Sequence, residues 1–82
     1  MNRKEFVKEV SKRKGLSQTK AYRSVNAVMD TIRMALLNGD EVEIGGFGTF
    51  AVVTDLKGER IPVFKAGRAL KNIINISESE EK

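Results

Sequence analysis

The amino-acid sequence predicts an α+β fold in which two helices are followed by a three-stranded antiparallel meander and a short third helix. Two observations support this prediction. Apolar residues recur at helical intervals over residues 3–37 and again over residues 67–76, as in amphipathic helices. Between these segments the pattern changes to alternation of polar and apolar residues, interrupted by glycines, as in strands joined by tight turns.

The first helix is expected at about Arg3 to Lys14. Asn2 and Glu5 have the spacing of an N-cap residue and its reciprocal glutamate, and Gly15 follows as a left-handed stop. Apolar residues recur at helical spacing between these two signals, which favours a short amphipathic helix.

The second helix is expected to be the longest element. Ser17 is its candidate N-cap residue, and Asn38-Gly39 is its expected end. Its apolar stripe is broader than one short helix can cover, which predicts burial against a second subunit. The stripe consists of Ala21, Val25, Val28, Met29, Ile32, Ala35 and Leu36, with Tyr22 and Leu37 beside it.

Three strands are expected over residues 41–64. Glu41 to Ile44 alternates polar with apolar residues, and Gly45-Gly46 can supply the positive φ of a tight turn. Thr49 to Val53 is rich in strand-forming residues. Asp55 to Gly58 has a tight-turn composition and returns the chain into a third strand, so the three strands form a meander.

A single domain, residues 1–76, covers nearly the whole chain. Its last element is a short helix over Gly67 to Ile76, in which Leu70 and Ile74 lie one turn apart. Residues 77–82 read Ser-Glu-Ser-Glu-Glu-Lys and lack apolar periodicity, which predicts an acidic, disordered tail.

Basic residues are concentrated in two groups. The chain has a net charge of +4, and because its tail holds three glutamates and one lysine, the body carries +6. Residues 1–23 contain eight basic and two acidic residues. The second group is Lys57, Arg60, Lys65, Arg68 and Lys71. Such clustering favours a polyanionic partner, because neutralised phosphates release counterions; a solvated helix surface is the alternative.

Several classes of function are disfavoured by composition. The chain has no cysteine and no histidine, so it lacks a thiolate metal site and the usual general base, and neither an enzyme nor a cofactor or metal site is expected. Gly45 to Gly48 is followed by no Gly-Lys-Ser/Thr, so it does not fit a phosphate-binding P-loop. No apolar stretch predicts a signal peptide or a membrane span, and a soluble, cytoplasmic protein is expected.

Two motifs resemble the signature of the HU and integration-host-factor family of bacterial histone-like proteins. They are Ile44 to Phe50 and, downstream, Pro62 to Lys71, and the likeness extends over nearly the whole chain with one large gap. The resemblance implies an HU-like fold built as an intertwined homodimer. It also implies that Phe47, Phe50 and Phe64 pack in the dimer core.

The resemblance implies a set of contacts to DNA phosphates at the turn between strands and at the starts of the first and third helices. The expected contact residues are Arg3, Gly46, Arg60, Lys65, Arg68 and Lys71, with a weaker expectation for Lys57. For each basic residue the alternative is a solvated surface charge.

The chain departs from the family pattern where the family has a long, basic β-arm. Only Ala51 to Ile61 joins the two motifs here, and Val53 and Asp55 stand where the family has arginines. The family kinks duplex DNA with a proline at the arm tip, whereas Pro62 here matches a proline of the strand. Ala66 replaces the proline usual before the third helix. Reduced or absent minor-groove kinking is therefore expected.

Two functions follow as hypotheses. The first is a histone-like, nucleoid-associated homodimer that binds and condenses double-stranded DNA through its basic body without sequence specificity. The alternative is a protein-interaction module that pairs with a full-length HU-type subunit, or with another partner, and modulates its DNA binding. The missing arm and the acidic tail motivate the alternative.

Overall fold

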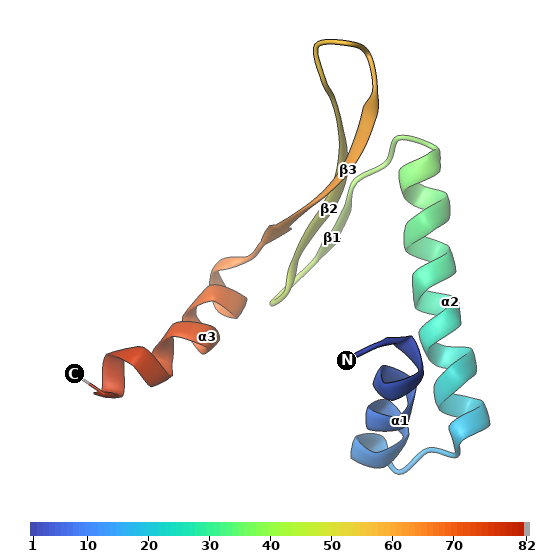
Figure 1. The fold of residues 1–82 in the computed structure, drawn as a ribbon, viewed down its shortest axis with the longest axis vertical. Coiled ribbons are helices and arrows are strands. Elements are labelled where there is room, and N and C mark those ends of the chain that lie inside the picture. The colour runs from blue at the N-terminus through green and yellow to red at the C-terminus, as the bar shows by residue number, and fades with distance from the viewer. Residues whose placement is uncertain (82) are drawn as a thin grey trace. The chain divides into compact units, whose positions relative to one another are not determined.

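The computed structural model describes the backbone of residues 1–81 and the side chains of residues 1–76. Its elements follow the order helix, helix, three strands, helix (Figure 1). They are α1 (Arg3–Lys14), α2 (Gln18–Leu37), β1 (Val42–Ile44), β2 (Gly48–Thr54), β3 (Arg60–Ala66) and α3 (Arg68–Glu81). The chain divides into two compact units, Met1–Arg33 and Met34–Lys82, which are described separately.

Both ends of α1 are fixed by the residues that the sequence pointed to. The Asn2 side chain accepts a hydrogen bond from the Glu5 amide at 2.9 Å, and the Glu5 carboxylate accepts one from the Asn2 amide at 3.2 Å. Gly15 ends the helix in the left-handed region, with φ of 63°. At the start of α2 the Ser17 hydroxyl accepts from the Lys20 amide at 3.1 Å. The predicted caps are confirmed.

The core of the first unit lies between α1 and α2. Val7, Ala21 and Val25 are buried there, and Val10 packs against them. Much of the apolar stripe of α2 is nevertheless open to solvent, because Val28 is 55% exposed and Met29 is 40% exposed.

The second unit contains an antiparallel sheet with the strand order β1-β2-β3, which confirms the predicted meander. The β2–β3 hairpin has a short, well-braced tip. The Asp55 carboxylate accepts hydrogen bonds from the amides of Lys57 at 2.8 Å and Glu59 at 2.9 Å. Gly58 takes the left-handed conformation that the turn requires, with φ of 85°.

Three phenylalanine rings cluster in the second unit. Phe50 pairs directly with Phe64 across β2 and β3, and their ring centroids lie 4.8 Å apart. Phe47, in the turn after β1, lies 5.3 Å from Phe64 by the same measure. Phe47 and Phe64 remain 44% and 42% exposed, so the cluster is open on one side.

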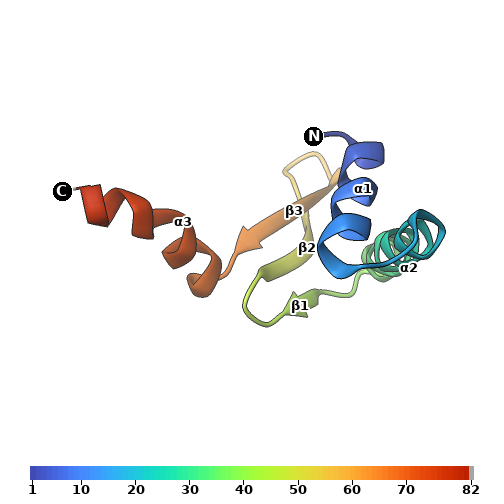
Figure 2. The ribbon, with the colours of Figure 1, turned by 90° about the horizontal axis from the view of Figure 1, so that it is seen from below.

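Helix α3 follows β3 after a single residue (Figure 2). It extends to Glu81, past Ile76 where the apolar periodicity predicted its end. Glutamate is a good helix former, so the backbone can continue without an apolar pattern. Residues 77–82 are the tail that the sequence predicts to be disordered. The side chains of residues 77–81 and the whole of Lys82 lie outside the described part of the chain. Ile73 and Ile74, at 66% and 65% exposure, leave the apolar face of α3 open.

Within residues 1–81, no helix combines the length and apolar character needed to cross a membrane.

Gly48 allows β2 to lie close against β3. A Cβ atom at this position would be 2.7 Å from the ring atom Cε1 of Phe64 and would also clash with the Lys65 carbonyl. We expect Gly48→Ala to lower the free energy of unfolding by about 1–3 kcal/mol, because the strand and the ring must shift. Thermal unfolding followed by circular dichroism measures the change. Gly45→Ala is the matched control, since a Cβ atom there meets nothing within 4 Å. Equal stability of the two variants would contradict the prediction.

Candidate nucleic-acid interface

The turn between β1 and β2 is tied to the start of α3. The Gly67 amide donates a hydrogen bond to the Phe47 carbonyl at 2.8 Å, and the Phe47 amide donates to the Ile44 carbonyl at 3.0 Å. Gly46 adopts a φ of 80°, which only glycine takes readily. The turn and α3 are far apart in the sequence, but the Gly67–Phe47 hydrogen bond places them side by side.

A small cavity of about 130 Å³ lies at this junction, and both Gly46 and Arg68 line it. Two of the residues expected to contact phosphate therefore come together. Lys65 lies in β3 opposite Thr49, another lining residue, so it is close to the same junction. We refer to Gly46, Lys65, Arg68 and Lys71 as the turn–helix site.

The first turn of α3 contributes backbone donors to the turn–helix site. The first amides of any helix lack partners within the helix, and the helix dipole makes this end positive. Arg68 is the first residue of α3, and the Lys71 amide donates to the Gly67 carbonyl at 3.1 Å as the helix begins. Both side chains are exposed. Amides and cations at one helix end form an environment suited to an anion.

The cations of the turn–helix site are available to a ligand. Among the side chains of residues 1–76, the ion pairs are Glu9 with Arg13 at 3.2 Å and Asp30 with Arg33 at 2.7 Å. Neither pair involves a member of the site. Within the described residues, no group of three or more potential metal ligands comes together.

Arg60 has an intramolecular role that the sequence did not indicate. Its Nη2 atom donates hydrogen bonds to the carbonyls of Leu36 at 3.0 Å and Leu37 at 3.2 Å. These carbonyls belong to the last turn of α2, where the helix dipole is negative and a cation is stabilising. Arg60 thus joins the beginning of β3 to the end of α2.

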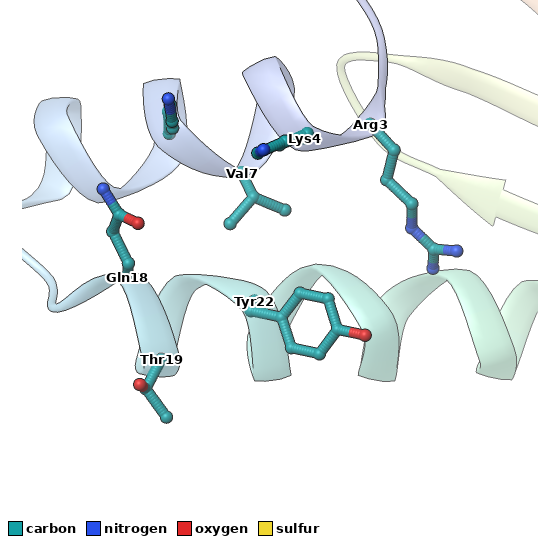
Figure 3. A pocket seen from close by; sticks show the side chains of 7 residues that line it. Arg3, Lys4, Val7, Gln18, Thr19 and Tyr22 are labelled. Atoms are coloured by element: carbon teal, nitrogen blue, oxygen red, sulfur yellow. The ribbon is translucent and has the colours of Figure 1, made fainter.

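Arg3 lies in the other unit, at the first residue of α1. Its Nη2 atom donates a 2.6 Å hydrogen bond to the Asn26 side chain of α2. Arg3 also lines a groove of about 530 Å³, in which Lys4, Lys8 and Tyr22 take part (Figure 3). We did not expect the last three to form a group from the sequence. The four-residue spacing of Lys4 and Lys8, which places them on one helix face, was the available signal.

Comparison with known proteins defines the family. Residues 1–59 match the family described as bacterial DNA-binding protein. The chain is 31% identical over 90 residues to DNA-binding protein HRL18 of Rhizobium leguminosarum, with 92% of this chain and 99% of the relative covered. It is 34% identical over 89 residues to DNA-binding protein HU of Geobacillus stearothermophilus, with 90% of this chain and 99% of the relative covered. The chain belongs to the HU family of bacterial DNA-binding proteins.

Solved structures of the HU family share the fold. HU from Thermotoga maritima superposes with a TM-score of 0.77 at 36% identity, covering 90% of this chain and 98% of that one. An Anabaena HU–DNA cocrystal structure gives a TM-score of 0.77 at 26% identity, covering 93% and 99%. The predicted α+β architecture and the family resemblance are confirmed. The HU family is histone-like and non-enzymatic, so the expectation that the chain is not an enzyme is confirmed as well.

The hydrogen bonds made by Arg60 generate a prediction about stability. Arg60→Ala removes a cation from the last turn of α2, and we expect a decrease of about 0.5–1 kcal/mol in the free energy of unfolding. Chemical denaturation provides the measurement. Lys57→Ala at the hairpin tip serves as the control, because it removes the same charge from the same hairpin. If Arg60→Ala is no less stable than Lys57→Ala, the capping role is wrong.

Proposed function

We propose that this HU-family chain forms a homodimer that binds double-stranded DNA through its phosphates, with little sequence preference and with little bending. The turn–helix site is the observation that supports the proposal most directly. Its parts come from two separate segments, the β1–β2 turn and residues 65–71 at the junction of β3 with α3, and the Gly67–Phe47 hydrogen bond brings them together.

Phosphate binding follows from the chemistry of the turn–helix site. Amides of the first turn of α3 and of the glycine turn donate hydrogen bonds to phosphate oxygens, as helix N-termini do. Lys65, Arg68 and Lys71 add positive charge, and Arg68 can form a bidentate pair with a phosphate. In the proposed complex, Arg3 contacts the DNA backbone from the other unit, and Arg60 combines helix capping with a more peripheral contact.

The proposed contacts position the protein on DNA without reading its sequence. Phosphates are the same at every base pair, so binding through them carries no direct sequence information. Affinity is then dominated by counterion release and falls steeply with salt. A nucleoid-associated, cytoplasmic protein that condenses DNA is the biological role we propose.

The salt dependence of binding tests the turn–helix site. We expect Arg68→Glu and Lys71→Glu each to weaken DNA binding. For a given variant, the loss of affinity should be the same on duplexes of unrelated sequence. Each should also reduce the slope of log affinity against log salt by about 1 for every phosphate that the variant no longer neutralises. Fluorescence anisotropy with duplexes of about three helical turns measures both quantities. Lys12→Glu on α1 matches the charge change at an exposed residue that is not among the expected DNA contacts. A slope in Arg68→Glu equal to that in Lys12→Glu would remove Arg68 from the interface.

The short β2–β3 hairpin supports the proposal of little bending. Thr54 pairs with Arg60 at the hairpin end, and five residues, 55–59, form its tip. The match to the family ends at residue 59, in the same place. In the alignment with HRL18, 92% of this 82-residue chain, about 75 residues, is spread over 90 positions. We infer that the unmatched positions correspond to an arm that this chain lacks.

The hairpin tip also lacks a proline. The chain has one proline, Pro62, and it lies within β3 opposite Val52. Kinking by proteins of this kind requires an apolar side chain wedged between base steps at a cost of a few kcal/mol, which additional contacts along wrapped DNA must offset. A short hairpin provides few such contacts.

A bending measurement tests this part of the proposal. On a duplex of about 30 base pairs labelled at both ends, saturating protein should change the energy-transfer efficiency very little, because a short duplex is stiff. A full-length HU-type protein measured in parallel is the positive control. An equal change for the two proteins would show that the hairpin bends DNA without an arm.

Exposed apolar surface supports the homodimer. Phe47 and Phe64 are each more than two-fifths exposed, and the apolar faces of α2 and α3 are open in the single chain. Obligate dimers bury surfaces of this kind, and small domains gain stability from doing so. We place the three phenylalanines in the dimer core.

Sedimentation equilibrium measures the assembly state. We expect a dimer at micromolar concentration, and we expect Phe64→Ala to shift the population toward unfolded monomer, since truncating a buried phenylalanine costs about 3–5 kcal/mol. A folded wild-type monomer would contradict the proposal. The heterodimer hypothesis is distinguished by co-refolding with a full-length HU-type subunit, where a preference for mixed over like pairs would favour it.

A further inference from the structure

The groove between α1 and α2 has an apolar floor and a basic rim. Val7 of α1 points toward α2, where the ring of Tyr22 lies (Figure 3). Val7 is buried, whereas Tyr22 is 56% exposed. The rim carries Arg3, Lys4 and Lys8 from α1, together with Gln18 and Thr19 from α2.

The charge of the groove is of one sign. Its lining contains three cationic side chains and no carboxylate. The two acidic residues of α1 are occupied, since Glu5 accepts from the Asn2 amide at 3.2 Å and Glu9 pairs with Arg13 at 3.2 Å. Arg3 is held by Asn26, but its guanidinium retains further donors. An anionic ligand therefore fits the rim.

The exposed ring of Tyr22 narrows the choice of anion. A planar π-face beside a row of cations is the arrangement with which proteins hold single-stranded nucleic acid, because bases stack on the ring while cations follow the backbone. Duplex DNA keeps its base faces stacked inside the helix and presents only phosphates and groove edges. A duplex would use the cations of the groove and leave the ring unused.

We propose that the α1–α2 groove binds single-stranded nucleic acid, with one base stacked on Tyr22 and the neighbouring phosphates held by Lys4 and Lys8. Lys4 and Lys8 lie one turn apart on the same face of α1, so both reach the strand that passes over the ring. This site and the proposed function have a nucleic-acid partner in common, and Arg3 lines the groove and is also a proposed duplex contact. Tyr22, Lys4 and Lys8 are not among the residues proposed to hold duplex DNA.

The intrinsic fluorescence of Tyr22 reports whether a ligand is stacked on its ring. Tyr22 is the one tyrosine of the chain, and there is no tryptophan, so the intrinsic fluorescence of the protein comes from this ring. The probes are a twelve-nucleotide oligothymidylate and an abasic strand with the same number of phosphates. We expect saturable quenching by the oligothymidylate and little quenching by the abasic strand. Equal quenching by both strands, or none by either, would overturn the stacking proposal.

Variants separate stacking from charge. In anisotropy titrations of labelled strands, wild-type protein should bind oligothymidylate about 5-fold or more tightly than the abasic strand, as expected for one stacked base. Tyr22→Leu removes the ring, keeps an apolar side chain, and should abolish this preference. Tyr22→Phe, which keeps a ring, should retain it. Lys4→Gln and Lys8→Gln should weaken the binding of both strands. An unchanged preference in Tyr22→Leu would refute the site.

The same titrations distinguish this proposal from the proposed function. Arg68→Glu should weaken the binding of a blunt duplex while leaving the ratio between the two single strands unchanged. Tyr22→Leu should leave the binding of the blunt duplex unchanged and abolish the difference in affinity between the two single strands. If Tyr22→Leu instead raises the dissociation constant of the dimer, a second copy of the chain covers the groove and the proposal is wrong. Thermal unfolding of Tyr22→Leu and Tyr22→Phe checks that both fold, and quenching of the wild-type protein tests the site without any variant.

Discussion

The hydrogen bond from the Gly67 amide to the Phe47 carbonyl is the constraint on which the turn–helix site depends. It holds the first turn of α3 against the loop between β1 and β2, so that residues of both segments line one small cavity. This hydrogen bond requires that β2 and β3 lie close together. Gly48 has no Cβ atom, and this lets the Phe64 ring and the Lys65 carbonyl lie directly against it. The proposed phosphate site thus depends on a packing requirement one residue away.

Arginine serves two physical roles in this chain. Arg60 stabilises the negative end of α2, and Arg3 joins α1 to α2 through Asn26. Each guanidinium has five donors, so one side chain can make an intramolecular bond and still have donors for a phosphate. A lysine in the same place offers a single ammonium group and no planar fork. Positive charge alone therefore does not separate the residues that hold the fold from those that contact a ligand.

The single chain buries little apolar surface for its size. Among the described side chains, the buried apolar residues are Val7, Ala21, Val25 and Ala51, and the three clustered phenylalanines are only partly covered. A small domain gains a large share of its stability from burial, so open helix and sheet faces favour association. In such a protein the dimer interface and the fold are parts of the same core, and the residues proposed to bind DNA lie outside it.

The sequence by itself determined the element order, the helix caps and the meander, because these depend on neighbours a few residues apart. Asn2, Glu5 and Gly15 mark α1, and Gly46 and Gly58 take the left-handed conformations that their turns require. The family motifs further indicated Arg68 and Gly46 as site residues. Only the tertiary structure placed these two at one cavity, gave Arg60 its hydrogen bonds to α2, and brought Tyr22, Lys4 and Lys8 into the lining of one groove. Such arrangements join residues far apart in the chain, and no local pattern of hydrophobicity or spacing specifies them.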